Sequence, residues 1–218
     1  MAIRAVIFDI GGVLELAPGG SGGEPTAGFA GLIAAWEARL GLAPGELDAR
    51  LHAMEERLRS QGKSGALGTC TEEEWLAELR ATTGMDQAQC DAFMRDHWDV
   101  YCGAPNAKLI AYFAALRPRY RTALLSNSFV GARREEQDRY HFEAIADLIV
   151  YSHEEGVAKP DPRIFQRTCE RLGVRPDEAV FLDDFPGHVA AARALGMHAI
   201  VFQDTAQAIA DLDACLAP

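Results

Sequence analysis

Short apolar runs that end at a polar or glycine residue recur along the chain. The first is Ala5–Phe8, which is followed by Asp9 and then by Gly11 and Gly12. Runs of this length that are rich in β-formers and bounded by turn residues predict buried strands. The same pattern predicts three further strands and one weaker candidate: Thr122–Leu125, Ala179–Leu182, Ala199–Phe202 and, as the weaker candidate, Leu148–Tyr151.

Helical spacing of apolar residues lies between these runs. It predicts helices over residues 107–116, 162–172 and 189–195, the last of which ends at Gly196. Strands that alternate with helices form parallel β-α-β units, in which the helices cover the faces of the sheet. We therefore predict an α/β fold, a three-layer Rossmann-like core with a mostly parallel sheet.

The long interval between the first two strands is mostly helical in pattern. Thr71 and Glu74 have the spacing of a capping box ahead of one of these helices. We predict that residues 17–100 form an inserted α-helical cap domain, whose own core includes Trp36 and Trp75. Residues 1–16 and 101–218 would then form the Rossmann-like core. The glycine-rich stretch Pro18–Gly23 is expected to be a flexible connector into the cap.

Composition narrows the class of protein. The 218 residues contain 21 Lys and Arg against 32 Asp and Glu, which gives a net charge of −11, and 49% of them are hydrophobic. Such a chain is globular, and it lacks the basic surface that binds nucleic acid or anionic lipid. We expect no nucleic acid and no membrane as partners. A small phosphorylated molecule remains possible, because a bound cation can reverse the local charge.

Several features favour the cytoplasm. No apolar stretch approaches the roughly 18 residues that a membrane span needs, and the N-terminus lacks the layout of a signal peptide. The five cysteines are scattered and form no C-x-x-C pair. This spacing disfavours a disulfide framework or a zinc site and fits a reducing compartment. We expect a cytoplasmic protein that is a monomer or a homodimer.

Polar side chains follow the predicted strands. Asp9 follows the first strand, Ser126 the second, and the pair Asp183 and Asp184 the fourth, while Lys159 lies in a loop before a helix. Ligands of open parallel sheets bind outside the carboxyl ends of the strands, so these groups are expected to converge. Clustered carboxylates repel one another unless a cation joins them, and oxygen ligands suit Mg²⁺. The nearby lysine points to an anionic substrate, most simply a phosphoryl group.

Four segments follow one another along the chain: Val6–Leu14, Leu124–Asn127, Lys159–Pro162 and Phe181–Asp184, the last followed by a helix that ends at Gly196-Met197. In order and spacing they resemble the motifs of the haloacid dehalogenase superfamily. The resemblance is to the subgroup of this superfamily whose helical cap follows the first strand. Any one segment alone is weak evidence, but the ordered set is specific.

The resemblance implies a Mg²⁺-dependent phosphohydrolase that acts on a small phosphorylated metabolite. Asp9 would be the nucleophile that forms an aspartyl-phosphate, which water then hydrolyses. The resemblance implies a metal site made of the Asp9 carboxylate, the Gly11 carbonyl, and Asp183 or Asp184. Phosphate oxygens would contact the side chains of Ser126 and Lys159 and backbone N–H groups near Gly11, Gly12 and Asn127.

One position departs from the family pattern. Phosphatases of the family usually carry a second aspartate two residues after the nucleophile, where it protonates the leaving group and activates water. Gly11 stands there, which preserves a carbonyl for the metal but supplies no acid or base. A well-placed acid or base contributes about 10²–10⁴-fold to the rate. His188 is a candidate replacement, since histidine can supply a proton near neutral pH; its ordinary interpretation is a helix-start residue at the rim.

Two alternatives stay open. A non-catalytic or weakly active phosphate-binding regulatory protein would account for Gly11, but not for the retention of the other site residues. A metal-independent 2-haloacid dehalogenase would also lack the second aspartate. Such dehalogenases typically carry an aromatic residue at the position of Gly11 and lack the acid pair seen here as Asp183 and Asp184.

Overall fold

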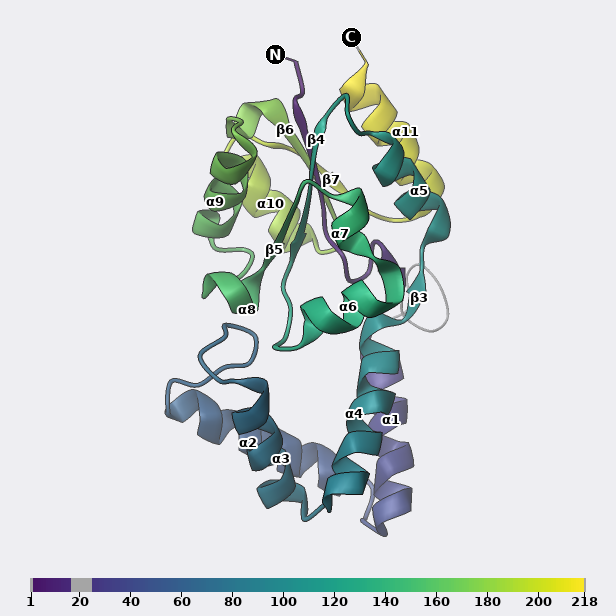
Figure 1. The fold of residues 1–218 in the computed structure, drawn as a ribbon, viewed down its shortest axis with the longest axis vertical. Coiled ribbons are helices and arrows are strands. Elements are labelled where there is room, and N and C mark those ends of the chain that lie inside the picture. Colours follow the sequence, from purple (N-terminus) through teal and green to yellow (C-terminus); the bar gives the residue numbers. More distant parts are fainter. Residues whose placement is uncertain (1, 17–24, 218) are drawn as a thin grey trace.

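A five-stranded parallel sheet forms the centre of the computed structural model, which describes residues 2–16 and 25–217 (Figure 1). The strand order is β5-β4-β1-β6-β7. All five predicted strands are present, including the weaker candidate, and β4 is one residue longer at each end than predicted. The strands are β1 Ala5–Phe8, β4 Arg121–Ser126, β5 Leu148–Tyr151, β6 Ala179–Asp183 and β7 His198–Val201.

Helices cover both faces of this sheet, which confirms the Rossmann-like α/β fold. Because successive side chains of a strand point to opposite faces, β1 contributes to two separate hydrophobic clusters. Val6 and Phe8 pack with α5 (Ala107–Ala115) and α11 (Thr205–Leu216) on one face. Ala5 and Ile7 pack on the other face, with α9 and α10, which span Pro162–Leu172 and Pro186–Ala194.

The central position of β1 determines where the sheet can bind a ligand. β1 pairs with β4 on one side and with β6 on the other, so that Phe8 aligns with both Leu124 and Leu182. The backbone N–H of Asp9 donates to the carbonyl of Leu182 at 2.8 Å. The order of the strands along the chain reverses at β1, and ligands of such sheets bind beside this reversal. Asp9 therefore lies at the expected binding edge.

A group of helices, here called the insert, follows the first strand and lies below the sheet in Figure 1. It begins after β2 (Glu15–Leu16) and ends before β3 (Ala104–Pro105), and these two strands pair antiparallel. The insert has its own hydrophobic cluster, to which Trp36 and Trp75 belong as predicted. Its described helices are α1 Pro25–Leu40, α2 Glu46–Ser60, α3 Glu72–Thr83 and α4 Gln87–Cys102.

Local sequence signals in the insert are partly confirmed. The capping box is present, since the Glu74 N–H donates to Thr71 Oγ1 at 3.1 Å and the Thr71 N–H donates to Glu74 at 2.9 Å. The predicted connector Pro18–Gly23 lies outside the described residues. In the described ranges, no helix is long and apolar enough to cross a membrane.

Several short helices were not predicted, because their sequences carry little apolar periodicity. In α6 (Ala132–Tyr140), only Ala132 and Glu136 are buried, and most other side chains are charged. The remaining short elements are α7 Phe142–Ile145, α8 Ser152–Glu155 and the 3₁₀ turn Pro176–Glu178. These short elements therefore lack the hydrophobic stripe from which a helix can be predicted.

Two carboxyl groups are buried where the insert joins the rest of the chain. Glu15 and Glu136 are 2% and 0% exposed. Glu136 accepts a hydrogen bond from the Tyr151 hydroxyl, whereas both oxygens of Glu15 and the second oxygen of Glu136 have no protein partner within the described chain. Burial raises the pKa of Glu136 from 4.5 to about 8, and burial together with the charge of Glu136 raises the pKa of Glu15. Both acids therefore resist ionisation.

This burial predicts a pH-dependent stability. The folded chain keeps a proton on Glu136 that the unfolded chain releases above pH 4.5, so stability falls as pH rises towards 8. Glu136→Gln cannot ionise and still accepts from Tyr151. We expect it to weaken the pH dependence and to stabilise the fold at pH 8 by about 1–3 kcal/mol. Urea unfolding between pH 5 and 8 measures the free energy of unfolding of each variant, and the exposed Glu56→Gln is the control. If this free energy changed equally with pH in both variants, the prediction would be contradicted.

Candidate active site

Lys159 lies between two carboxylates that come from neighbouring strands. Its Nζ is 2.8 Å from Asp9 Oδ1 and 2.7 Å from Asp183 Oδ2. Asp9 follows β1, Asp183 ends β6, and Lys159 comes from the loop between α8 and α9. The side chains of Lys159 and Asp183 have no exposed surface, and that of Asp9 is 10% exposed. Two carboxylates share one ammonium, so the cluster carries a net negative charge when Asp9 is ionised and can then attract a further cation.

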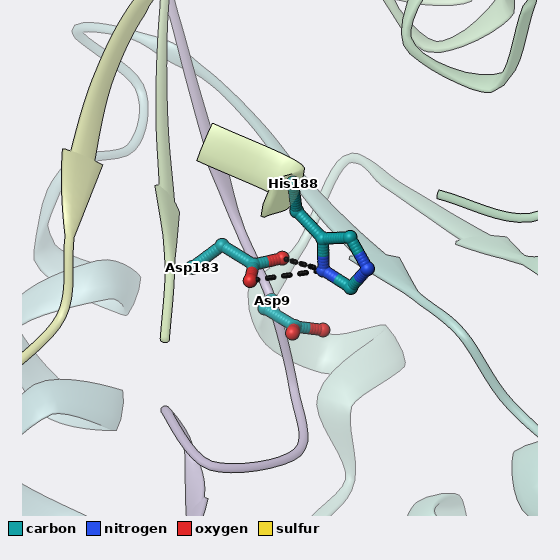
Figure 2. Close-up of side chains that lie close together, drawn as sticks. All are labelled: Asp9, Asp183 and His188. Carbon is teal, nitrogen blue, oxygen red and sulfur yellow. Dashed lines mark hydrogen bonds and ion pairs between the residues drawn. The ribbon is translucent and has the colours of Figure 1, made fainter. Parts of the chain in front are cut away.

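Asp183 is held by donors on both of its oxygens. Its Oδ1 accepts from the Phe185 N–H at 2.8 Å and its Oδ2 from Lys159 at 2.7 Å, while His188 Nδ1 lies 3.0 and 3.1 Å from the two oxygens (Figure 2). Burial alone would raise the pKa of Asp183. The hydrogen bond from His188 and the charge of Lys159 outweigh burial and hold this pKa at about 2. Asp183 is therefore an ionised group that orients its neighbours.

Asp9 keeps one oxygen free for chemistry. Its Oδ1 accepts from the Ile10 N–H at 2.8 Å and from Lys159, whereas Oδ2 has no hydrogen bond within the described residues. Burial raises the pKa of Asp9, Lys159 opposes that shift, and the negative charge of Asp183 adds to it. A cation near the carboxylate would favour the ionised form that a nucleophile requires.

The loop after β4 holds Lys159 in place. Asn127 donates from Nδ2 to the Lys159 carbonyl at 2.8 Å and accepts from the Lys159 N–H at 2.7 Å. Sequence reasoning missed this clamp, because an asparagine after a strand is equally typical of a simple turn. The neighbouring Ser126 is 3% exposed, and within the described residues its hydroxyl makes a single long hydrogen bond, 3.4 Å, to the Asn127 carbonyl. Its hydroxyl thus remains available to a ligand.

Gly12 allows Asp184 to approach the loop after β1. Gly12 has a φ of +76°, and a Cβ placed there would collide with the Asp184 carboxylate. Gly11 is exposed, and a Cβ there would meet nothing within 4 Å. Asp184 is exposed too, and its carboxylate accepts no side-chain hydrogen bond in the part of the chain that is described. Asp184 is thus the member of the acid pair with free oxygens.

Oxygen and nitrogen donors suitable for a metal converge here. Asp9, Asp183 and His188 offer one ligand atom each within 4.8 Å of one another (Figure 2). Because Lys159, Phe185 and His188 already donate to Asp183, a cation gains more from Asp9 and Asp184. The structure thus brings together most of the predicted site residues, while Gly11 and Gly12 lie in the adjoining loop.

Comparison with known proteins agrees with these features. A family model described as haloacid dehalogenase-like hydrolase matches residues 3–196. The chain belongs to this family. Mouse acyl-CoA dehydrogenase family member 10 is 30% identical over 98% of the chain, which covers only 19% of that relative's length. A Mycobacterium tuberculosis phosphatase is 29% identical over 62% of each protein.

Solved structures of other haloacid dehalogenase-like proteins share the fold. A family enzyme from Bacteroides thetaiotaomicron superimposes with a TM-score of 0.74 at 20% identity, covering 97% of this chain and 99% of that one. The same enzyme in complex with magnesium and inorganic phosphate gives a TM-score of 0.68 at 21% identity, over 92% and 94%. A 2-haloacid dehalogenase from Pseudomonas syringae gives 0.63 at 19% identity, over 92% and 86%.

The two glycines of the loop provide a matched pair of variants. Gly12→Ala places a Cβ at positive φ and against the Asp184 carboxylate, so the loop must shift. We expect a loss of about 1–2 kcal/mol or more in the free energy of unfolding. The Cβ of Gly11→Ala meets open space, so this variant is the control and its free energy of unfolding should change little. Thermal unfolding measures both; equal melting temperatures would contradict this account of the loop.

Proposed function

We propose that the chain is a Mg²⁺-dependent phosphohydrolase that acts on a small phosphate monoester through Asp9. The observation that carries the proposal is the Lys159 ammonium, which fixes one oxygen of Asp9 and leaves the other free. A carboxylate beside a buried ammonium suits attack on a phosphoryl group, whose own negative charge the ammonium can stabilise. The phosphatase relative and the magnesium–phosphate complex of a similar structure support this choice.

The residues present suit magnesium. The donors are oxygens of Asp9 and Asp184 with the backbone carbonyl of Gly11, and the absent side chain of Gly12 leaves room for Asp184. Asp183 would orient Lys159 and His188 beside this group. When bound, the metal neutralises charge on the transferring phosphoryl group. The retained Asp183 and Asp184 pair also favours this reading over a metal-independent dehalogenase.

The chain's own residues account for the remaining steps. Lys159 and the Ser126 hydroxyl bind phosphoryl oxygens, helped by backbone N–H groups of Gly11, Gly12 and Asn127. Asp9 Oδ2 attacks phosphorus, the bond to the alcohol breaks, and an aspartyl-phosphate forms on Asp9. Water then attacks this phosphorus, which releases inorganic phosphate and restores the Asp9 carboxylate.

His188 is proposed as the acid and base that Gly11 does not supply. Its Nδ1 faces Asp183, whereas the other ring nitrogen, Nε2, has no hydrogen bond within the described residues. A carboxylate that fixes one nitrogen of an imidazole orients the second nitrogen for proton transfer. His188 lies in the first turn of α10, and its side chain is 14% exposed, so substrate can reach it.

Removal of the Asp9 carboxylate tests the proposed function. We expect Mg²⁺-dependent hydrolysis of p-nitrophenyl phosphate by the unaltered chain and its loss in Asp9→Asn, because an amide is a poor nucleophile. The matched control is Asp138→Asn, an exposed position on α6. Phosphate release that is equal in Asp9→Asn and the control would contradict the assignment of Asp9.

Removal of the His188 imidazole tests the proton-transfer step. His188→Ala should lower kcat by about tenfold or more and flatten its pH profile, since a general acid contributes about 10²–10⁴-fold. The exposed His198→Ala, at the opposite end of the sheet, is the control. An unchanged kcat and profile in His188→Ala would show that another group carries the proton.

A dehalogenase is the second candidate, favoured by the similar dehalogenase structure and by the absence of an acid at Gly11. It predicts metal-independent halide release from 2-chloropropionate without phosphatase activity. A chain that turns over neither class but binds phosphate would instead fit the regulatory alternative. The same assays with and without Mg²⁺ separate these outcomes.

A further inference from the structure

A cavity of about 230 Å³ lies among the four helices of the insert. Most of its lining is aromatic or aliphatic, and the lining contains neither lysine nor arginine. This volume lies below the range of roughly 300–1,000 Å³ that is usual for ligand pockets, so it suits no more than a single ring or a short chain. The lining residues are Phe29, Leu32, Ile33, Asp48, Leu51, His52, Glu55, Trp75, Phe93 and His97.

One wall of this cavity contacts the loop that follows β4. Phe129 lies two residues beyond Asn127, and its ring centroid is 5.1 Å from that of Trp75 and 6.4 Å from that of His97. The insert touches the same loop through its backbone, since the Val130 N–H donates to the Gly65 carbonyl at 3.2 Å. The cavity therefore lies next to the loop that carries the Ser126 hydroxyl.

His97 is the polar group of the otherwise apolar part of the lining. Its ring lies 5.2 Å from Phe29 and 5.4 Å from Trp98, and no hydrogen-bond partner is found for it within the described chain. Burial lowers the pKa of His97 to about 4, so the ring is neutral at pH 7. A neutral imidazole offers one donor and one acceptor, which suits a hydroxyl or carbonyl and does not attract an anion.

Charged groups at the edge of the cavity act against a second anion. Asp48 and Glu55 come from α2, and the only other polar lining residue of that helix is His52, whose ring lies 3.5 Å from Asp48. Burying a carboxylate or a second phosphate near these acids costs more than burying an uncharged group. The cavity thus combines apolar walls, one neutral hydrogen-bonding ring and an acidic edge.

We propose that this cavity receives the alcohol part of the substrate, and that this part is an uncharged apolar group. The inference rests on the proposed phosphohydrolase function and narrows its substrate class. The phosphoryl group would lie at Asp9 and Lys159, and the ester would extend past Phe129 into the insert. Monoesters of aromatic or aliphatic alcohols fit this arrangement, and a hydroxyl or carbonyl on the ring would pair with His97. Sugar phosphates and bisphosphates fit it poorly.

Hydrolysis-resistant phosphonates test the inference without turnover. With Mg²⁺ present, isothermal titration calorimetry should give benzylphosphonate an affinity about tenfold higher than that of methylphosphonate, because only the former fills the apolar cavity. Leu51→Asn puts an amide in the wall and should remove this preference while it leaves methylphosphonate binding unchanged. Leu76→Asn, a half-buried leucine of the same insert outside the lining, is the matched control.

A second variant tests the polar contact. His97→Phe keeps a ring of similar size, so the variant should still prefer benzylphosphonate. It should lose any increase in affinity that a hydroxyl group on the benzyl ring of the ligand provides. Equal binding of benzyl- and methylphosphonate, or a preference that survives Leu51→Asn, would overturn the cavity assignment and leave the phosphohydrolase proposal standing. Failure of both phosphonates to bind, with no ester hydrolysed, would contradict the proposed function itself.

Discussion

The shared Lys159 ammonium is the interaction on which the rest of the site depends. It joins Asp9 to Asp183, and all three side chains are taken out of water by the strand ends around them. Removing one partner of a buried ion pair costs about 3–5 kcal/mol, because the remaining charge is left without compensation. Such a cluster forms only if the parallel register of β1 and β6 and the clamp by Asn127 are both correct.

Much of this arrangement could be predicted from the chain. Each strand is a short apolar run, and the carboxyl ends of parallel strands meet at one edge, so Asp9, Ser126 and Asp183 were placed together. The contacts made by Asn127 could not be predicted, because they join residues 32 positions apart through side-chain geometry. The helix α6 and the burial of Glu15 could not be predicted for a different reason. The charged sequence of α6 has no apolar periodicity, and a glutamate carries no signal that it will be buried.

Gly11 stands where phosphatases of the family usually carry a second aspartate, and the structure shows what surrounds this position. Gly11 opens space beside Asp9, and His188 faces the same cluster from α10, held by Asp183. The net charge of the chain is acidic, and Lys159 opposes it locally at the site. Chemistry would therefore come from the sheet edge, and selection of the alcohol from the insert, with Phe129 between the two. Under the proposed function, the charged cluster would perform the chemistry and the apolar cavity would select the substrate.

The proposed reaction requires that Asp9 accept the phosphoryl group. Rapid acid quenching during Mg²⁺-dependent turnover, followed by mass spectrometry of the peptide that contains Asp9, tests it directly. If Asp9 is the nucleophile, this peptide gains the mass of one phosphoryl group and loses it on treatment with hydroxylamine. Steady release of phosphate with no phosphoryl group on Asp9, or with the group on another residue such as His188, would contradict it.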